Sequence, residues 1–124
     1  MYHGIIIDKE FKDSKFINSF KIFNKRKSTD SDWLLFGIEV EDQKLSATIN
    51  AIQENLREGK PFYAHLYNNK KLIIIFKKKI FSAFMDVYPW KDFIDYGKSL
   101  GIPEKQLKVS PIRFEDEVNY FNLT

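Results

Sequence analysis

Residues 61–85 set the architecture of this chain, and they read PFYAHLYNNKKLIIIFKKKIFSAFM. Three runs rich in aromatic and β-branched residues are separated by two short polar breaks, which include Asn68-Asn69 and Lys77-Lys78-Lys79. Apolar runs that alternate with turn residues are typical of an antiparallel β-meander. Asn tolerates the left-handed backbone region, so Asn68-Asn69 suits a tight turn between the first two strands.

The meander has one strand with no polar face and one with two different faces. Residues 72–76 read Leu-Ile-Ile-Ile-Phe, and a strand that is apolar on both sides needs cover on both sides. In the preceding strand, alternation separates the apolar row Phe62, Ala64 and Leu66 from a second row. That second row carries Tyr63, His65 and Tyr67. Together with Trp33 it is the candidate ligand face.

A helix is predicted before the meander, over residues 42–57. Its apolar positions recur at spacings of four, three and four, which is the pattern of a single buried stripe. Asp42 is the expected N-cap and Gly59 the expected stop. The stripe consists of Leu45, Ile49, Ile52 and Leu56.

A second helix is predicted after the meander. It begins at Asp86 or Tyr88, with Pro89 in its first turn, and Gly101 ends it. Its expected buried stripe is Trp90, Phe93, Ile94, Gly97 and Leu100. Glycine has no side chain to hold a helix away from its neighbour, so Gly97 indicates a close approach to the sheet.

The remaining segments extend this plan into one α+β domain over residues 1–124. Strands are predicted at 2–7, 20–26, 33–40 and 108–114, the last confined to an edge by Pro111, and a short helix begins at 115–117. We expect a mainly antiparallel sheet of five to seven strands with both main helices on one face. From residue 33 onward the order suits a ferredoxin-like βαββαβ layer. The first two strands then extend or flank this sheet.

Composition restricts the classes of function. The chain has no cysteine, which excludes disulfides, cysteine-ligated zinc, iron–sulfur centres and thiol catalysis, and which fits a reducing cytoplasm. No apolar run approaches the roughly 20 residues of a membrane helix. Met1 is followed by strand-like residues and not by a basic leader with a long apolar run, so we expect no signal peptide. We therefore expect a cytoplasmic protein with no membrane partner and no resident cofactor.

Positive charge gathers in the meander. Residues 59–85 carry six lysines and no acidic residue, although the net charge of the whole chain is only +3. The turn lysines can serve solubility and guard the strand edges, or they can form a rim that faces an anion. The candidate anion rim is Lys70, Lys71, Lys77, Lys78 and Lys79.

His65 is the first candidate for catalysis, because strand alternation places it between two tyrosines. An imidazole there can act as a general base, or it can be a half-buried histidine satisfied by a hydroxyl or carbonyl group. His3 with Asp8 or Glu39 lacks metal-ligand spacing. The acidic run 115–117 is typical of a solvated helix start rather than a cation site. No metal site is predicted.

An aromatic sheet face also raises the possibility of a nucleic-acid platform. Trp33, Leu35, Tyr63 and Tyr67 can share that face, and single-stranded bases stack on such surfaces. The basic–Gly–aromatic motif of RNA-recognition domains is absent, so nucleic acid is not the favoured partner. The alternative is that the N-terminal segment or a second subunit covers these aromatic rings.

Four stretches carry a resemblance to a known family. They are residues 1–7, residues 61–81, Tyr96-Gly97-Lys98-Ser99-Leu100-Gly101-Ile102-Pro103 and Arg113-Phe114-Glu115-Asp116-Glu117. Together they resemble a family of small uncharacterised prokaryotic proteins of similar length. The resemblance implies a stand-alone domain, and it supplies no activity and no site residues.

The sequence favours a non-catalytic binding or assembly module. Two helices can cover only one face of a small sheet, so the apolar residues of the other face predict a homodimer that buries them. The alternatives are a small enzyme that uses His65 as general base and a single-stranded nucleic-acid binder. The identity of a ligand does not follow from the sequence.

Overall fold

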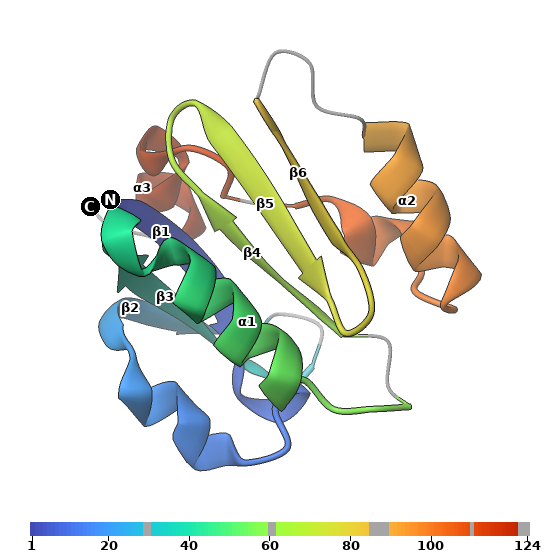
Figure 1. The fold of residues 1–124 in the computed structure, drawn as a ribbon, viewed down its shortest axis with the longest axis horizontal. Coiled ribbons are helices and arrows are strands. Elements are labelled where there is room, and N and C mark those ends of the chain that lie inside the picture. The colour runs from blue at the N-terminus through green and yellow to red at the C-terminus, as the bar shows by residue number, and fades with distance from the viewer. Residues whose placement is uncertain (29–30, 60–61, 85–89, 110, 122–124) are drawn as a thin grey trace.

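A single open antiparallel sheet of six strands forms the centre of the computed structural model (Figure 1). The structure describes residues 1–28, 31–59, 62–84, 90–109 and 111–121. The strands are β1 (Tyr2–Ile7), β2 (Lys21–Lys27), β3 (Leu34–Val40), β4 (Tyr63–Tyr67), β5 (Lys71–Phe76) and β6 (Ile80–Phe84). Their order in the sheet is β2-β3-β1-β4-β5-β6. The predicted α+β class and antiparallel sheet are confirmed.

The predicted meander is the β4–β5–β6 half of the sheet. Tyr63 pairs with Phe76 in one hairpin, and Ile75 pairs with Ile80 in the next. The turn at Asn68 is stabilised by its own side chain, because Asn68 Oδ1 accepts hydrogen bonds from the backbone amides of Lys70 at 2.9 Å and Lys71 at 2.8 Å. The short-range pattern therefore predicted this half of the sheet correctly.

The position of β1 differs from the prediction that it extends or flanks the sheet. β1 lies between β3 and β4 and is antiparallel to both. Ile5 and Ile6 point to opposite faces of the sheet and both are buried, which suits a central strand. β3 and β4, the strands that α1 (Leu45–Asn55) connects, are thereby separated, and in the described residues no strand follows α2 (Trp90–Ser99). The ferredoxin-like order is therefore not confirmed.

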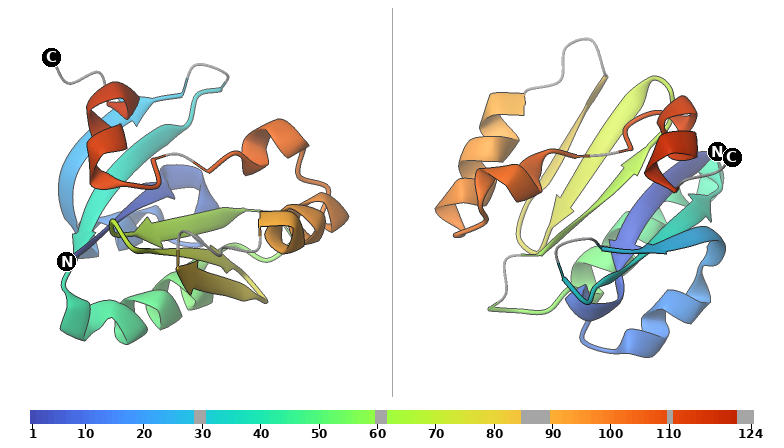
Figure 2. Two further views of the ribbon diagram at one scale, coloured as in Figure 1. Left: turned by 90° about the horizontal axis from the view of Figure 1, so that it is seen from above. Right: turned by 180° about the vertical axis from the view of Figure 1, so that it is seen from behind.

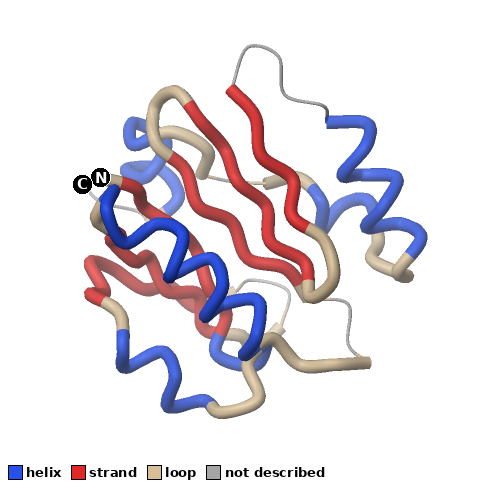
Figure 3. The backbone as a smooth tube through the Cα atoms, in the orientation of Figure 1, coloured by secondary structure: helices blue, strands red, loops and turns tan. Residues whose placement is uncertain are grey.

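One face of the sheet, here called the α1 face, is closed by apolar packing. The stripe of α1 contributes the buried side chains Ile52 and Leu56, with Leu45 and Ile49 partly buried beside them. The 3₁₀ segments η1 (Asp8–Glu10) and η2 (Ser14–Ser19) add cover, with Phe11 and Ile17 buried on the same side. Figure 3 shows α1 in front of the strands.

The ends of this first helix differ from the predicted ones. Asp42 lies in the 3₁₀ segment η3 (Asp42–Lys44) and does not cap it: Glu41 occupies the N-cap, and the Asp42 carboxylate pairs with the N-terminal amine of Met1. The helix ends at Asn55, before Gly59, because Leu56 is extended and forms a β-bridge with Phe11.

The opposite face, here called the α2 face, is covered by α2 and by residues 102–121, here called the C-terminal segment. This segment contains η5 (Glu104–Leu107), η6 (Phe114–Asp116) and α3 (Glu117–Tyr120), and it crosses the back of the sheet in Figure 2. Phe93 of α2 packs in the core of this face, whereas Ile52 of α1 packs in the other. The prediction that both main helices share one face is therefore wrong.

Three details of the α2 region also depart from the sequence reading. Gly97 allows close approach to Leu107 rather than to the sheet, since a Cβ atom there would lie 2.5 Å from Leu107 Cδ2. Leu100 is 41% exposed instead of buried. Residues 108–109 and 111–114 form no strand. Gly101, with φ of +90°, does end α2, whereas the predicted helix start at Asp86 or Tyr88 lies outside the described residues.

None of the helices in the described part of the chain combines the length and the apolar character that a membrane crossing needs.

Candidate functional site

The row Tyr63, His65 and Tyr67 is covered by the C-terminal segment, and each of the three side chains is hydrogen-bonded to it. The Tyr63 hydroxyl donates to the backbone oxygen of Gln106 at 2.5 Å. His65 Nε2 donates to the backbone oxygen of Pro111 at 2.9 Å, and the Tyr67 hydroxyl donates to the Glu117 carboxylate. The three side chains on one face of β4 thus bind three points of the C-terminal segment in the same order along the chain. These hydrogen bonds satisfy the polar groups of the row, which explains why it can lie on an interior face.

Glu117 is the buried end of this arrangement. Its Oε2 atom meets Tyr67 and also lies 2.6 Å from His3 Nδ1. The imidazole of His3 lies between the rings of Phe23 and Phe114, at centroid distances of 4.4 Å to each. Burial, followed by the hydrogen bond and the charge of Glu117, raises the pKa of Tyr67, so the phenol keeps its proton. This cluster fixes α3 against the centre of the sheet.

His3 does lie near Glu39, with 3.9 Å between Nε2 and Oε1, but its other nitrogen is committed to Glu117. Among the described residues, no group of three or more metal-ligating side chains is arranged to hold an ion. Glu117 of the acidic run 115–117 is buried within the fold, and Asp116 accepts hydrogen bonds from the backbone amides of Ile112 and Arg113. Asp116 therefore organises the chain locally, whereas Glu117 links α3 to His3 and Tyr67, so the prediction of a solvated helix start is wrong for Glu117.

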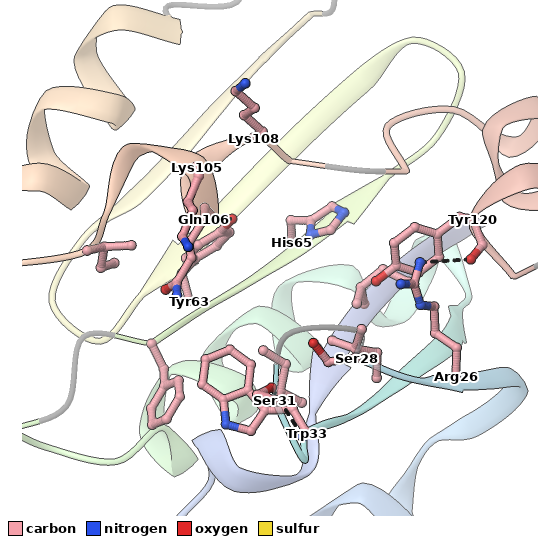
Figure 4. Close-up of a pocket in the computed structure, with 15 residues that line it drawn as sticks. Arg26, Ser28, Ser31, Trp33, Tyr63, His65, Lys105, Gln106, Lys108 and Tyr120 are labelled. Atoms are coloured by element: carbon pink, nitrogen blue, oxygen red, sulfur yellow. Dashed lines mark hydrogen bonds between the residues drawn. The ribbon is translucent and has the colours of Figure 1, made fainter.

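A cleft of about 390 Å³ opens beside Tyr63 and His65 (Figure 4). Its walls come from three parts of the chain that are distant in sequence. β2 and the loop that leads to β3 supply Arg26, Ser28, Ser31 and Trp33. The C-terminal segment supplies Lys105, Gln106 and Lys108, and also Tyr120, which lies beside Arg26. The third part is β4, with Tyr63 and His65. We call this cleft the Trp33–His65 cleft.

The predicted ligand-face residues divide between this cleft and the interior. Trp33, Tyr63 and His65 all line the cleft, and in Figure 4 the indole and the imidazole lie on different sides of it. Tyr67 does not line it, because it is fully buried beside Glu117. Strand alternation brought the right residues to one face, but the C-terminal segment then separated Tyr67 from the others.

None of the predicted rim lysines lines the Trp33–His65 cleft. Lys77 Nζ donates to the backbone oxygens of Gln53 at 3.0 Å and Glu54 at 2.7 Å, where it satisfies carbonyl groups at the end of α1. Lys79 Nζ lies 5.2 Å from the ring centroid of Phe81. Lys70 and Lys71 belong to the turn at Asn68, and Lys78 is exposed after β5.

The cations that line the cleft are instead Arg26, Lys105 and Lys108, and none of its lining residues in the described part of the chain is acidic. Arg26 Nη1 donates to the backbone oxygen of Tyr120 at 3.0 Å, and its guanidinium lies 4.6 Å from the Tyr120 ring centroid. Lys105 and Lys108 are exposed and form no ion pair within the described part of the chain. Their ammonium groups therefore contribute a positive potential to the cleft.

These three residues were missed by the sequence reading, and no local signal identified them. Arg26 is one of several basic residues on β2, and Lys105 and Lys108 lie in a segment with no regular charge pattern. Only the crossing of the C-terminal segment over the sheet brings them to one cleft. The predictable part of the site was its aromatic wall.

His65 presents a neutral imidazole to this cleft. Burial lowers the pKa of His65 to about 4, and its hydrogen bond to Pro111 acts in the opposite direction. The carbonyl of Pro111 can only accept, so Nε2 carries the proton and Nδ1 is a bare acceptor. A general base is most effective with a pKa near the working pH, which makes His65 a weak base at neutral pH.

No protein-family model matches the chain, and no curated protein and no solved structure matches it significantly. The resemblance to a family of small prokaryotic proteins therefore stays a prediction.

Proposed function

We propose that this protein is a non-catalytic binding module that holds a small organic anion with a planar ring in the Trp33–His65 cleft. The observation that carries the proposal is the lining of the cleft, where Arg26, Lys105 and Lys108 occur and where none of the described lining residues is acidic. An anion bound there is attracted by these three cationic side chains.

Size and shape support a small molecule rather than a polymer. Small-molecule sites commonly enclose about 300–1,000 Å³, and a volume of about 390 Å³ lies near the lower end of that range. The indole of Trp33 offers a flat surface for stacking an aromatic ring, and Nδ1 of His65 can accept a hydrogen bond from the ligand. These features favour a ligand with a ring, a donor group and a negative charge.

The two alternative functions have weaker support. An enzyme that uses His65 as general base needs a pKa closer to neutrality than about 4. A nucleic-acid platform needs an open aromatic face, yet Tyr67 is fully buried beneath the C-terminal segment. A binding module requires neither condition.

The proposal also includes the homodimer, although the first reason for it is wrong. The sheet face that was expected to lie open is covered by α2 and the C-terminal segment, so no large apolar face requires a second copy. The homodimer is therefore proposed on another surface, which is described in the next subsection. The cytoplasmic location likewise stays a prediction.

A fluorescent aromatic sulfonate, 1-anilinonaphthalene-8-sulfonate, tests the binding proposal, with the uncharged N-phenyl-1-naphthylamine as the matched neutral probe. We expect the sulfonate to bind with one-to-one stoichiometry and the neutral probe to bind more weakly. Lys105→Gln and Lys108→Gln should each weaken sulfonate binding roughly three- to tenfold, as expected for loss of one nearby charge.

The control variants are Lys70→Gln and Lys78→Gln, which remove the same charge from exposed positions outside the cleft. Their dissociation constants should match the wild-type value within twofold. Equal losses in all four variants would show a diffuse charge effect and contradict the proposed site. Equal binding of the two probes would contradict the requirement for an anion.

A further inference from the structure

The two edge strands of the sheet differ in their protection against pairing. β2 carries four basic residues, and its pairing with β3 contains a register shift between Ile22 and Asn24. Charged side chains and bulges are the usual devices that prevent an edge from pairing with another strand. β6 reads Ile-Phe-Ser-Ala-Phe, carries no charge, and pairs with β5 in continuous register.

The apolar side chains of β6 are also exposed. Phe84 is 62% exposed, the highest fraction among the large apolar side chains of the described residues, and Ile80 is 37% exposed. Ile80 pairs with Ile75, whose side chain belongs to the core of the α1 face, so Ile80, Ser82 and Phe84 lie on that side of the sheet. Figure 1 shows α1 in front of β1 and no helix in front of β6.

We propose that β6 is the interface of the homodimer, and that it pairs antiparallel with β6 of a second copy about a two-fold axis near Ser82. In that register Ile80 of one copy lies opposite Phe84 of the partner subunit. The two exposed side chains of each copy are then covered by their counterparts, and the unpaired backbone groups of both edges are satisfied. The two sheets become one continuous sheet.

The sequence on either side of Ser82 fits a second copy of this chain in particular. The large side chains Ile80 and Phe84 lie on either side of the small Ser82. The order large, small, large is the same in both directions, so two antiparallel copies of β6 can face each other about Ser82. The lysine run 77–79 precedes the strand, and in an antiparallel pair the two runs lie at opposite ends of the interface. A parallel pair would bring them together, and their repulsion opposes it.

This inference rests on the homodimer of the proposed function but not on the ligand site. No residue of β6 lines the Trp33–His65 cleft. Failure of the dimer would therefore leave the probe-binding experiment unaffected, and failure of probe binding would leave the dimer unaffected.

A cysteine at the proposed axis gives a direct test, because the natural chain contains no cysteine. Across an antiparallel pair the Cβ atoms are about 4.5–5.5 Å apart, so Ser82→Cys on both copies can form a disulfide with little movement. We expect this variant to become a covalent dimer under mild oxidation. Ile22→Cys, at the similarly exposed position of β2, should remain unlinked.

Light scattering without oxidant completes the test. The wild-type protein should show about twice the 14.8 kDa chain mass at micromolar concentration. Phe84→Lys should raise the dimer dissociation constant at least tenfold while circular dichroism shows an intact fold, and Ile22→Lys should leave it unchanged. A monomeric wild-type protein across the dilution series would overturn the proposal. A dimer that neither cross-links in Ser82→Cys nor weakens in Phe84→Lys would also overturn it.

Discussion

On the α1 face the sheet meets a helix mainly through apolar side chains, with one hydrogen bond from Gln53 to the backbone oxygen of Phe76. On the α2 face it presents a polar row to a segment with little regular structure. Ile52 of α1 is fully buried among side chains such as Ile6 and Ile38. Tyr63 and His65 on the other face donate hydrogen bonds to backbone oxygens of the C-terminal segment. The two layers are therefore joined to the sheet by different interactions.

This difference bears on the surroundings of the Trp33–His65 cleft, which lies on the α2 face. Apolar side chains interdigitate and leave few voids, because packing improves as space is filled. Hydrogen bonds act in a fixed direction and at a fixed distance, so they hold a segment at chosen points without filling the space between them. The Trp33–His65 cleft lies beside two of these points, Tyr63 and His65. The hydrogen-bonded C-terminal segment thus covers the α2 face and leaves this cleft beside it.

The largest effect is expected from the apolar side. Ile52→Ala should lower the free energy of unfolding by about 2–4 kcal/mol, because it leaves a cavity in a site with no exposed surface. Ile49→Ala should cost less, since Ile49 is only partly buried. Urea denaturation measures both values. Losses below about half a kcal/mol for both variants would show that the helix stripe does not close this face.

An effect of comparable size, which depends on pH, is expected from His65. Its pKa of about 4 in the folded protein lies below the value near 6.5 of an unfolded chain, so between these pH values the unfolded state binds more protons. Stability should therefore be complete above pH 6.5 and should fall by roughly 3 kcal/mol as the pH falls to 4. Denaturation at a series of pH values measures this loss.

The matched variant is His65→Gln, whose side-chain amide can still donate to the carbonyl of Pro111. Buried Glu10 acts with the opposite sign, because its raised pKa makes folding less favourable as the pH rises. The difference between the wild-type and His65→Gln curves removes that contribution. Parallel curves would contradict a buried, neutral His65.

The smallest effects are expected from single hydroxyl groups on the α2 face. Tyr67→Phe should cost about 1–3 kcal/mol, because it removes a donor from the buried Glu117 carboxylate. Tyr63→Phe should cost about 1 kcal/mol, since it breaks one hydrogen bond to a backbone oxygen. Thermal unfolding of both variants gives the ranking. If neither variant shifts the midpoint, hydrogen bonds do not hold the C-terminal segment.

The parts of the fold that sequence predicted correctly are those with local patterns. The meander and the stripe of α1 depend on contacts within a few residues, so alternation and helical spacing identified them. Trp33, Tyr63 and His65 were placed on one sheet face by the same reasoning, and all three line the cleft.

The parts that sequence predicted wrongly depend on distant partners. The central place of β1 follows from its pairing with both β3 and β4, and no pattern within residues 2–7 specifies those neighbours. Residues 108–114 have strand-like alternation, yet Val109, Ile112 and Phe114 pack against the core of the α2 face. The backbone oxygen of Pro111 accepts a hydrogen bond from the His65 side chain there, and not from the backbone of a neighbouring strand.

The link between His3 and Glu117 joins two positions 114 residues apart, and it has a consequence for synthesis on the ribosome. All six strands of the sheet precede the C-terminal segment in the chain, so a nascent sheet has its α2 face uncovered until residues 102–121 have been made. During that interval the apolar side chains of β5 are exposed to other chains and to chaperones. The cover of the α2 face is therefore acquired later in synthesis than the sheet itself.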